Sequence, residues 1–276
     1  MPYIEAEGRT LYAESFGDVA DPPLLLVNGL SSQMLSWPEE FCLAFVDRGF
    51  FVMRFDNRDV GLSTIFPEGS SYTLSEMADD CVEVMSHFGF DSAHVMGISM
   101  GGMIGQVLAI DHPEAVLTLT SYASKTGNPK FGAATEEANA ALMAPEPTTR
   151  EESIASNIRG KKIWGTEGGW NEEEFAEFVG RCWDRSEPRG GGARQYAAIM
   201  ASGNREDALA KLEVPTLVIH GSADPLIPAS GGERTAAVIP NAQYEVIDDM
   251  GHDVPMPDWP QIVQLVTMHA ANAAGR

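Results

Sequence analysis

The sequence predicts an α/β fold, with a mostly parallel sheet, helices on both of its faces and a helical insertion. Three observations predict it. In the first half of the chain, short apolar runs with β character alternate with stretches of helical periodicity. The alternation returns after about residue 213, and strand signals are missing between the two parts. We therefore expect an interrupted core formed by residues 1–124 and 213–276, and a helical cap, or lid, over residues 125–212.

The first half of the chain contains the pattern of a hairpin followed by core strands. Residues 3–16 are typical of a hairpin with its turn at Gly8. Apolar runs then predict strands at residues 23–28, 50–56, 94–98 and 116–122. Runs of this kind are typical of parallel strands that are covered on both faces.

Two sequences with the spacing of a capping box predict where helices begin. Ser36 and Glu39 open a predicted helix that extends to about Arg48, and Thr73 and Glu76 open a second one. The second helix has one apolar face at helical spacing, formed by Leu74, Met77, Ala78, Cys81, Val82, Met85 and Phe88. A further helix is expected directly after Ser99.

The insertion is predicted to be helical, with one flexible stretch. Asn171 starts a helix that carries an apolar stripe, and the EPRGGGAR sequence at 187–194 predicts a flexible connection. After the insertion, strands are predicted at 216–220 and 242–248, followed by an amphipathic C-terminal helix. The residues of the apolar stripe are Phe175, Phe178, Val179, Cys182 and Trp183.

Composition and charge exclude several classes of protein. The 276 residues include 18 Lys and Arg against 40 Asp and Glu, and the net charge of −22 argues against binding to nucleic acid or to anionic membranes. No apolar run approaches the roughly 18–20 residues that span a bilayer, and MPYIEAEGRT at the start lacks the pattern of a secretory signal. Three cysteines are too few for a disulfide framework or a zinc site. We expect a cytoplasmic protein that is a monomer or a homodimer.

The acidic residues are unevenly distributed along the chain. Residues 133–212 carry 14 acidic and 10 basic side chains, whereas the rest of the chain carries 26 and 8. This contrast predicts some electrostatic attraction between the insertion and the core. It also predicts a preference for neutral or cationic substrates over polyanionic ones.

The segment Gly97-Ile-Ser-Met-Gly101 has the pattern G-x-S-x-G, between a predicted strand and a predicted helix. This context is typical of a nucleophile elbow, in which small residues two positions from the serine allow a strained turn. The alternative is a glycine-rich turn that cradles a phosphate. A phosphate loop is expected to have a P-loop lysine or a G-x-G-x-x-G spacing, and neither is present. The pattern thus predicts that Ser99 is a nucleophile.

Two further residues complete a predicted catalytic triad. Asp224 lies just beyond the strand at 216–220, and His252 follows the strand at 242–248. The chain order Ser99, Asp224, His252 is that of α/β-hydrolases. Asp59 is a rival acid, which we interpret instead as a loop-fixing partner of Arg58 or Asn57. The remaining candidates are interpreted as structural or surface residues: His87, His94, His112, His220, His269, Asp248, Asp249 and Asp253.

A serine hydrolase also needs two donors for the oxyanion that forms during the reaction. The backbone N–H of Met100, directly after the nucleophile, and that of Leu30, after the strand at 23–28, are the predicted donors. Candidate residues for the substrate pocket are Leu30, Met100, Trp164 and Trp183. For the aromatic cap residues, the alternative is that they hold a small helical subdomain together.

The chain resembles an α/β-hydrolase over essentially its whole length. Segments 27–41, 54–64 and 93–102 are similar to the aclacinomycin methylesterase branch of carboxylesterases. They also resemble cofactor-free haloperoxidases and proline iminopeptidases. The resemblance implies a carboxylic ester hydrolase that acts on small to medium, largely apolar esters through an acyl-enzyme on Ser99, with no cofactor and no metal. The sequence departs from most relatives at Asn28, where they have His, and at Asp59, where many have Gly.

Other functions remain open for the same residues. A lactonase, an amidase, a C–C hydrolase, a cofactor-free haloperoxidase or perhydrolase, and an acyltransferase share this nucleophile and base. A non-catalytic small-molecule receptor is a further alternative from a different class. A serine in place of an aspartate nucleophile argues against haloalkane dehalogenase and epoxide hydrolase chemistry.

Overall fold

The structure is a computed structural model that describes residues 2–274. In this part of the chain the sheet has eight strands, in the order β1-β2-β4-β3-β5-β6-β7-β8. β1, β2 and β4 pair antiparallel, and the remaining neighbours pair parallel. The strands are β1 (Tyr3–Ala6), β2 (Arg9–Phe16), β3 (Pro23–Val27), β4 (Phe51–Asp56), β5 (Ala93–Ile98), β6 (Val116–Tyr122), β7 (Thr216–Gly221) and β8 (Gln243–Ile247). The predicted α/β fold with a mostly parallel sheet is confirmed.

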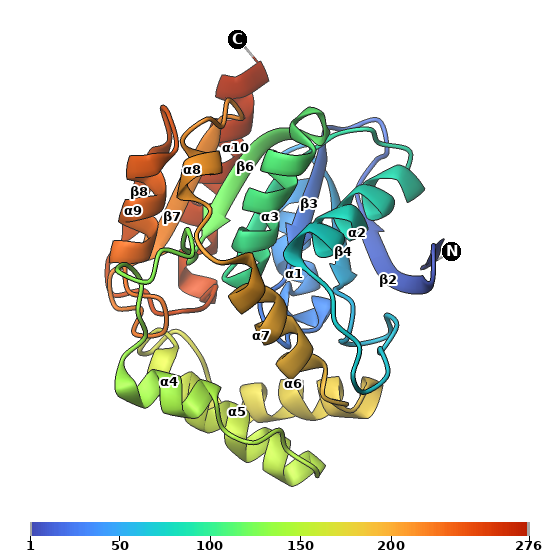
Figure 1. Ribbon diagram of the computed structural model, residues 1–276, viewed down its shortest axis with the longest axis vertical. Helices are drawn as coiled ribbons and strands as arrows, with labels where there is room; N and C mark the ends of the chain where they lie inside the picture. The colour runs from blue at the N-terminus through green and yellow to red at the C-terminus, as the bar shows by residue number, and fades with distance from the viewer. Residues whose placement is uncertain (1, 275–276) are drawn as a thin grey trace.

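Helices cover both faces of the sheet (Figure 1). One face packs against α1 (Glu39–Val46) and α10 (Trp259–Ala274). The other packs against α2 (Leu74–His87) and α3 (Met100–Asp111), while α9 (Ser230–Val238) contacts β7 and β8. Short 3₁₀ turns lie at Met34–Ser36, Pro113–Ala115 and Met256–Asp258.

The central strands are buried on both sides because each face has its own hydrophobic cluster. In β3, Leu25 and Val27 belong to the cluster under α2 and α3, whereas Leu24 and Leu26 belong to the one under α1 and α10. Every residue of β3 is buried. This two-sided burial is why the strand reads in sequence as an uninterrupted apolar run.

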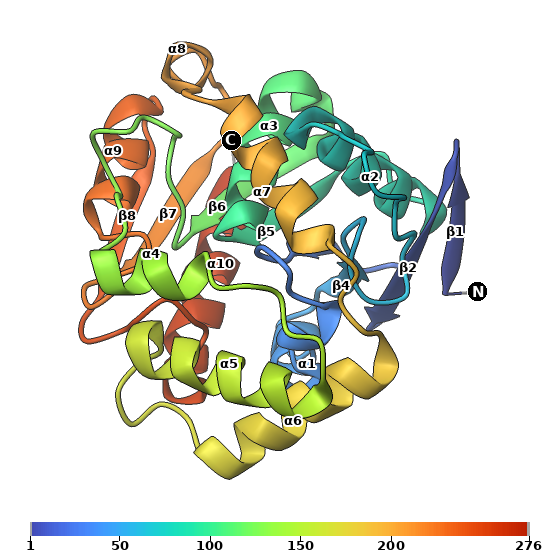
Figure 2. The same ribbon diagram turned by 60° about the horizontal axis from the view of Figure 1, so that its bottom comes forward.

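The chain between β6 and β7 folds into the helices α4 (Glu136–Leu142), α5 (Arg150–Trp164), α6 (Glu172–Arg185), α7 (Gly191–Ser202) and α8 (Glu206–Leu209). Of these, α4, α5 and α6 extend beyond one end of the sheet, whereas α8 lies toward the opposite end (Figures 1 and 2). In both views α5 and α6 lie side by side, and α7 runs back to the core. Where the segment leaves and rejoins the core, the backbone N–H of Arg205 donates to the Thr126 carbonyl at 3.0 Å. The division into a core of 1–124 and 213–276 and a cap of 125–212 stays a prediction.

Two local predictions are wrong. Helix α1 has Pro38 as its N-cap and no side-chain cap, because Ser36 ends the preceding 3₁₀ turn, in which its N–H donates to the Gln33 carbonyl. The predicted flexible connection 187–194 is too long, because residues 187–190 lie outside the helices but 191–194 form the first turn of α7. That helix is held from its first turn because the Arg194 guanidinium donates two hydrogen bonds of 2.8 Å to Asp59.

The two capping-box sequences give a matched stability test. Thr73 accepts a hydrogen bond from the Glu76 N–H, and the Glu76 carboxylate accepts one from the Thr73 N–H, so T73A removes a real cap. We expect T73A to lower the free energy of unfolding by about 1 kcal/mol. S36A is expected to leave it unchanged, since the Ser36 side chain caps nothing. Urea unfolding followed by circular dichroism measures both values, and an equal loss in the two variants would contradict the assignment.

Candidate active site

The predicted site residues lie at the carboxyl ends of neighbouring strands. Ser99 follows β5, Asp224 follows β7, His252 follows β8, and Leu30 follows β3. In a parallel sheet these ends share one edge, where the loops can bring side chains together. In Figure 1 this is the edge toward which β6 points, on the side of α4, α5 and α6.

Ser99 occupies a strained turn between β5 and α3. Its backbone has φ 56° and ψ −117°, a positive φ that costs a residue other than glycine about 1–3 kcal/mol. The turn is fixed by two hydrogen bonds, from the Ser99 N–H to the Tyr122 carbonyl at 2.9 Å and from the Ser124 hydroxyl to the Ser99 carbonyl at 2.7 Å. A Cβ on Gly101 would lie 2.1 Å from the Val27 carbonyl oxygen, so the glycine lets α3 press against β3.

Asp224 and His252 are joined by a hydrogen bond of 2.6 Å between Oδ2 and Nδ1. A carboxylate can only accept here, so Nδ1 carries the proton and Nε2 is the basic nitrogen of the neutral ring. The other oxygen of Asp224 accepts from the N–H groups of Leu226 and Ile227, both at 2.9 Å. The carboxylate is thus held by the loop that follows β7. Within residues 2–274 no hydrogen bond joins the Ser99 hydroxyl to the ring, and such bonds commonly tighten only when substrate binds.

The environment of Asp224 stabilises its charged form. Burial by itself raises the pKa of this carboxyl, but the charge of His252 and the hydrogen bonds of His220 and His252 outweigh burial and hold the pKa well below 3.8. His220 lies on β7 with its Nε2 3.5 Å from Asp224 and 2.6 Å from the Ile227 carbonyl. His220 therefore lies next to Asp224 on the side of β7, which agrees with its interpretation as a structural residue.

The two predicted oxyanion donors flank Ser99. Met100 follows it at the start of α3, and Gly29, next to Leu30, lies against the Ser99 side chain. Among the described residues, neither the Leu30 N–H nor the Met100 N–H donates to another group of the protein. Their role as oxyanion donors stays a prediction. The loop that carries Leu30 is held from the insertion, because the Gln195 side chain accepts from the Ser31 N–H at 2.8 Å.

The candidate pocket residues differ in their placement. Met100 is fully buried in the core cluster under α2 and α3, and Leu30 is partly buried against it. Trp164 ends α5, and its carbonyl accepts a hydrogen bond from the His252 N–H. Trp183 is half-buried on α6. Their role as pocket lining stays a prediction.

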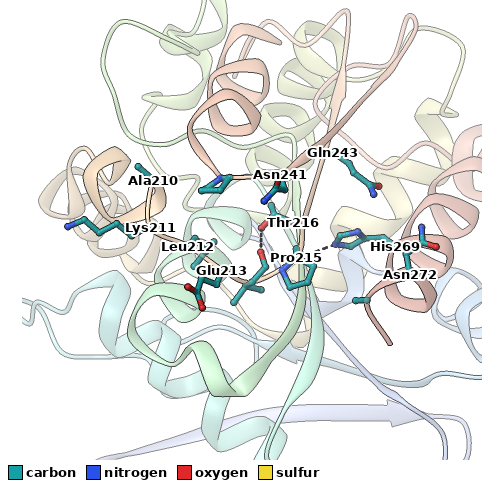
Figure 3. A pocket seen from close by; sticks show the side chains of 13 residues that line it. Ala210, Lys211, Leu212, Glu213, Pro215, Thr216, Asn241, Gln243, His269 and Asn272 are labelled. Carbon is teal, nitrogen blue, oxygen red and sulfur yellow. Dashed lines mark hydrogen bonds between the residues drawn. The ribbon is translucent and has the colours of Figure 1, made fainter. Parts of the chain in front are cut away.

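One cavity of about 350 Å³ lies away from these residues (Figure 3). It is lined by the chain that leads into β7, by the loop before β8 and by α10, including Thr216, Asn241 and His269. This is the amino end of β7 and β8, opposite the ends that carry Asp224 and His252. His269 is buried there with Nε2 3.1 Å from the Pro215 carbonyl, so of the structural and surface roles predicted for it, the surface role is wrong.

Asp253 is a residue whose role the sequence analysis missed. It was interpreted as loop surface, but it is only 8% exposed and forms an ion pair of 2.5 Å with Lys161 of α5. Its carboxylate also accepts from the hydroxyl and the N–H of Thr166. The basic residues of the insertion were a signal for such a pair, although nothing in sequence indicated which carboxylate each one contacts.

Two further carboxylates of the core also pair with the insertion. Asp59 binds Arg194 of α7, so the prediction that it pairs with Arg58 or Asn57 is wrong. Asp56 is fully buried, forms an ion pair of 2.7 Å with Arg185 of α6, and accepts from the N–H of Met34. These pairs join α6 and α7 to the loops that follow β3 and β4.

Asn28, directly after β3, is fully buried at the start of the predicted oxyanion loop. The side-chain NH2 of Asn28 donates to the Phe55 backbone carbonyl at 3.3 Å. The backbone carbonyl of Asn28 accepts from the Asn57 side chain at 3.1 Å. The side chain thus ties the end of β3 to the end of β4. It holds the loop without a titratable group.

Within residues 2–274 no group of three or more His, Cys, Asp and Glu side chains is arranged to hold a metal ion. None of the described helices is both long and apolar enough to cross a membrane.

The fold, the strained serine turn and the paired carboxylate and imidazole define the class of protein to which this chain belongs. It is a member of the alpha/beta hydrolase fold family, which matches residues 22–258.

Three comparisons place the chain within this class. Rhodomycin D methylesterase DauP of Streptomyces sp. (strain C5) is 30% identical over 278 residues, which cover 92% of each chain. 3-Oxoadipate enol-lactonase 2 of Acinetobacter baylyi is 27% identical over 89% of this chain and 87% of the enzyme. Among solved structures, the meta-cleavage product hydrolase CumD of Pseudomonas fluorescens IP01 has a TM-score of 0.81 at 20% identity, covering 98% of this chain and 97% of that one. This last likeness shows the shared fold alone.

The lowered pKa of Asp224 leads to a test of stability against pH. A carboxyl whose pKa is lower in the folded than in the unfolded chain stabilises the fold above its unfolded pKa, and this contribution is lost as the pH falls. At pH 7 we expect the free energy of unfolding of D224N to be about 1–3 kcal/mol lower than that of the natural chain. The difference should narrow as the pH falls below 3.8, where the unfolded carboxyl protonates. Urea unfolding of both proteins at pH 7, 5 and 3.5 measures it, and a difference that widens toward low pH would contradict the assigned direction.

Proposed function

We propose that this protein is a carboxylic ester hydrolase with Ser99 as its nucleophile, His252 as general base and acid, and Asp224 as the residue that orients the base. The observation that carries the proposal is the 2.6 Å hydrogen bond from His252 Nδ1 to a buried Asp224, at the same edge of the sheet as a serine in a strained strand–helix turn. Family membership and the methylesterase relative support the same chemistry.

In the first half of the proposed reaction, Ser99 Oγ attacks the acyl carbon while His252 Nε2 takes its proton. The N–H groups of Leu30 and Met100 stabilise the oxyanion of the tetrahedral intermediate, a contribution of about 10²–10³ in kcat for each donor. His252 then gives the proton to the leaving alcohol, and an acyl-enzyme forms on Ser99.

In the second half, a water molecule gives its proton to His252 Nε2 and attacks the acyl carbon. The tetrahedral intermediate collapses, the proton returns to Ser99 Oγ, and the carboxylic acid leaves. Asp224 stays ionised throughout. Its carboxylate keeps the proton of the neutral ring on Nδ1 and stabilises the imidazolium that forms in each half.

The proposed substrates are small to medium, largely apolar esters, with residues 125–212 as the cap that selects them. Methyl esters are the first to test, because the relatives DauP and DnrP are rhodomycin D methylesterases. The cationic side chains that join α5, α6 and α7 to the core are each paired with a carboxylate, namely Lys161, Arg185 and Arg194. This pairing supports a preference for neutral over multiply anionic esters. The cytoplasmic location and the monomeric or homodimeric state stay predictions.

A second candidate is lactone hydrolysis, which the likeness to an enol-lactonase favours. A lactone would use the same nucleophile, base and oxyanion donors, but its leaving alcohol stays tethered to the acyl group. Initial rates with methyl esters, p-nitrophenyl esters and lactones of equal carbon number separate the two. Faster turnover of the lactones would replace the ester assignment.

The decisive mutation is S99A. Removal of Oγ abolishes the acyl-enzyme, and we expect kcat for p-nitrophenyl butyrate to fall by about 10⁴–10⁶. S124A is the matched control, because that hydroxyl supports the same turn through the Ser99 carbonyl and lies outside the proposed triad. Unchanged ester turnover in S99A would show that the triad is assigned wrongly.

Labelling by a fluorophosphonate tests whether the site is catalytically competent. We expect covalent modification of Ser99 in the natural chain and none in S99A, measured by mass spectrometry of the labelled peptide. A folded natural chain that does not react would favour the small-molecule receptor over the hydrolase.

A further inference from the structure

The loop that carries His252 is bound by the end of a cap helix along three successive residues. The Gly251 N–H donates to the Thr166 hydroxyl at 2.9 Å, and the His252 N–H donates to the Trp164 carbonyl at 2.5 Å. The Asp253 carboxylate accepts from Lys161 and Thr166, at 2.5 and 2.6 Å for the side-chain donors. We call these contacts the histidine clasp.

The histidine clasp holds the loop from the side of the insertion, and residues of the core hold the same loop from the other side. The Tyr122 hydroxyl of β6 donates to the Asp253 carbonyl at 2.7 Å, and the Ala223 N–H donates to the Met250 carbonyl at 3.0 Å. The packing on the cap side is tight, because a Cβ on Gly251 would lie 2.3 Å from the Trp164 carbonyl oxygen. The imidazole is thus attached to a loop whose backbone is held both by the insertion and by the sheet.

From this geometry we propose that Asp253 is a positioning residue for His252, and that it acts through Lys161 and Thr166 of the cap. The inference rests on the proposed function, because it assigns a role in holding the base of that reaction. The Asp253 and Lys161 side chains are only 9% and 15% exposed. Separation of the end of α5 from this loop would leave the buried Asp253 carboxylate without its partner, which costs free energy. The same ion pair therefore stabilises both the contact of α5 with the loop and the position of His252.

Positioning of this kind has a clear kinetic consequence. Displacement of a catalytic group by about 1 Å can cost up to 10²-fold in rate, even where the altered residue does not touch substrate. Loss of the clasp should therefore lower kcat, whereas KM should change little because no substrate contact is removed. The rate of phosphonylation of Ser99 should fall in parallel, since that reaction also needs His252.

The experiment compares D253N, K161M and the double variant with the natural chain. Each single change is expected to lower kcat for p-nitrophenyl butyrate by about 10- to 100-fold. The kcat of the double variant should be no lower than that of the less active single variant, since both changes break the same ion pair.

Two further variants keep the proposal testable if the charge changes impair folding. T166V removes the hydroxyl that bridges Gly251 and Asp253 at nearly constant volume, and T166S keeps it. We expect a lowered kcat in T166V and recovery in T166S. K162M is the matched control, because the neighbouring lysine is exposed and pairs with Glu172 inside the cap, so its kcat should be unchanged.

The outcomes separate the two proposals. Normal kcat in folded D253N, K161M and T166V, with an active natural chain, would overturn the positioning role alone. Absence of both ester turnover and labelling in the natural chain would overturn the proposed function itself. Thermal unfolding of each variant, followed by circular dichroism, shows which of them are folded.

Discussion

The turn at Ser99 is the constraint on which the arrangement of this molecule depends. A side chain other than glycine is held at positive φ there, and the surrounding backbones must approach closely enough to keep it in place. Helix α3 therefore presses on β3, and Gly101 leaves room for the Val27 carbonyl. The same approach brings the start of α3 beside the loop after β3, where the amides of Met100 and Leu30 lie. The strain at one residue thus organises two strand ends, a helix start and the loop between them.

Three ion pairs join the insertion to the edge of the sheet that carries Ser99, and in each of them the cation belongs to the insertion. Lys161, Arg185 and Arg194 come from the insertion, and each pairs with a buried carboxylate of the core. The pair formed by Arg234 of α9 and Glu206 of α8 has the opposite polarity and lies where the insertion rejoins the core. An acidic core and a nearly balanced insertion are therefore complementary at specific contacts. Buried pairs of this kind specify a docking geometry more than they add stability, because both charges lose water on docking.

Sequence patterns predicted most of the fold and missed most of the contacts between core and insertion. The strands were readable because two-sided burial leaves apolar runs, and the Thr73 cap was readable because all its partners lie within four residues. The similar spacing at Ser36 failed, since Pro38 starts α1 and Ser36 closes the turn before it. The places of Asp59 and Asp253 depend on residues 135 and 92 positions away along the chain, Arg194 and Lys161. One-letter patterns carry no signal for pairs of that kind.

The hydrogen bond between the His252 N–H and the Trp164 carbonyl also bears on how such enzymes can be recombined. Here the segment 161–166 and the segment 250–253 form one unit, although the first belongs to the insertion and the second to the core. In a chimera with this core and the insertion of a relative, the residues that contact the His252 loop would come from the relative, and their contacts would not match that loop. The smallest transferable part therefore includes both segments, and the boundary suggested by chain topology cuts through it.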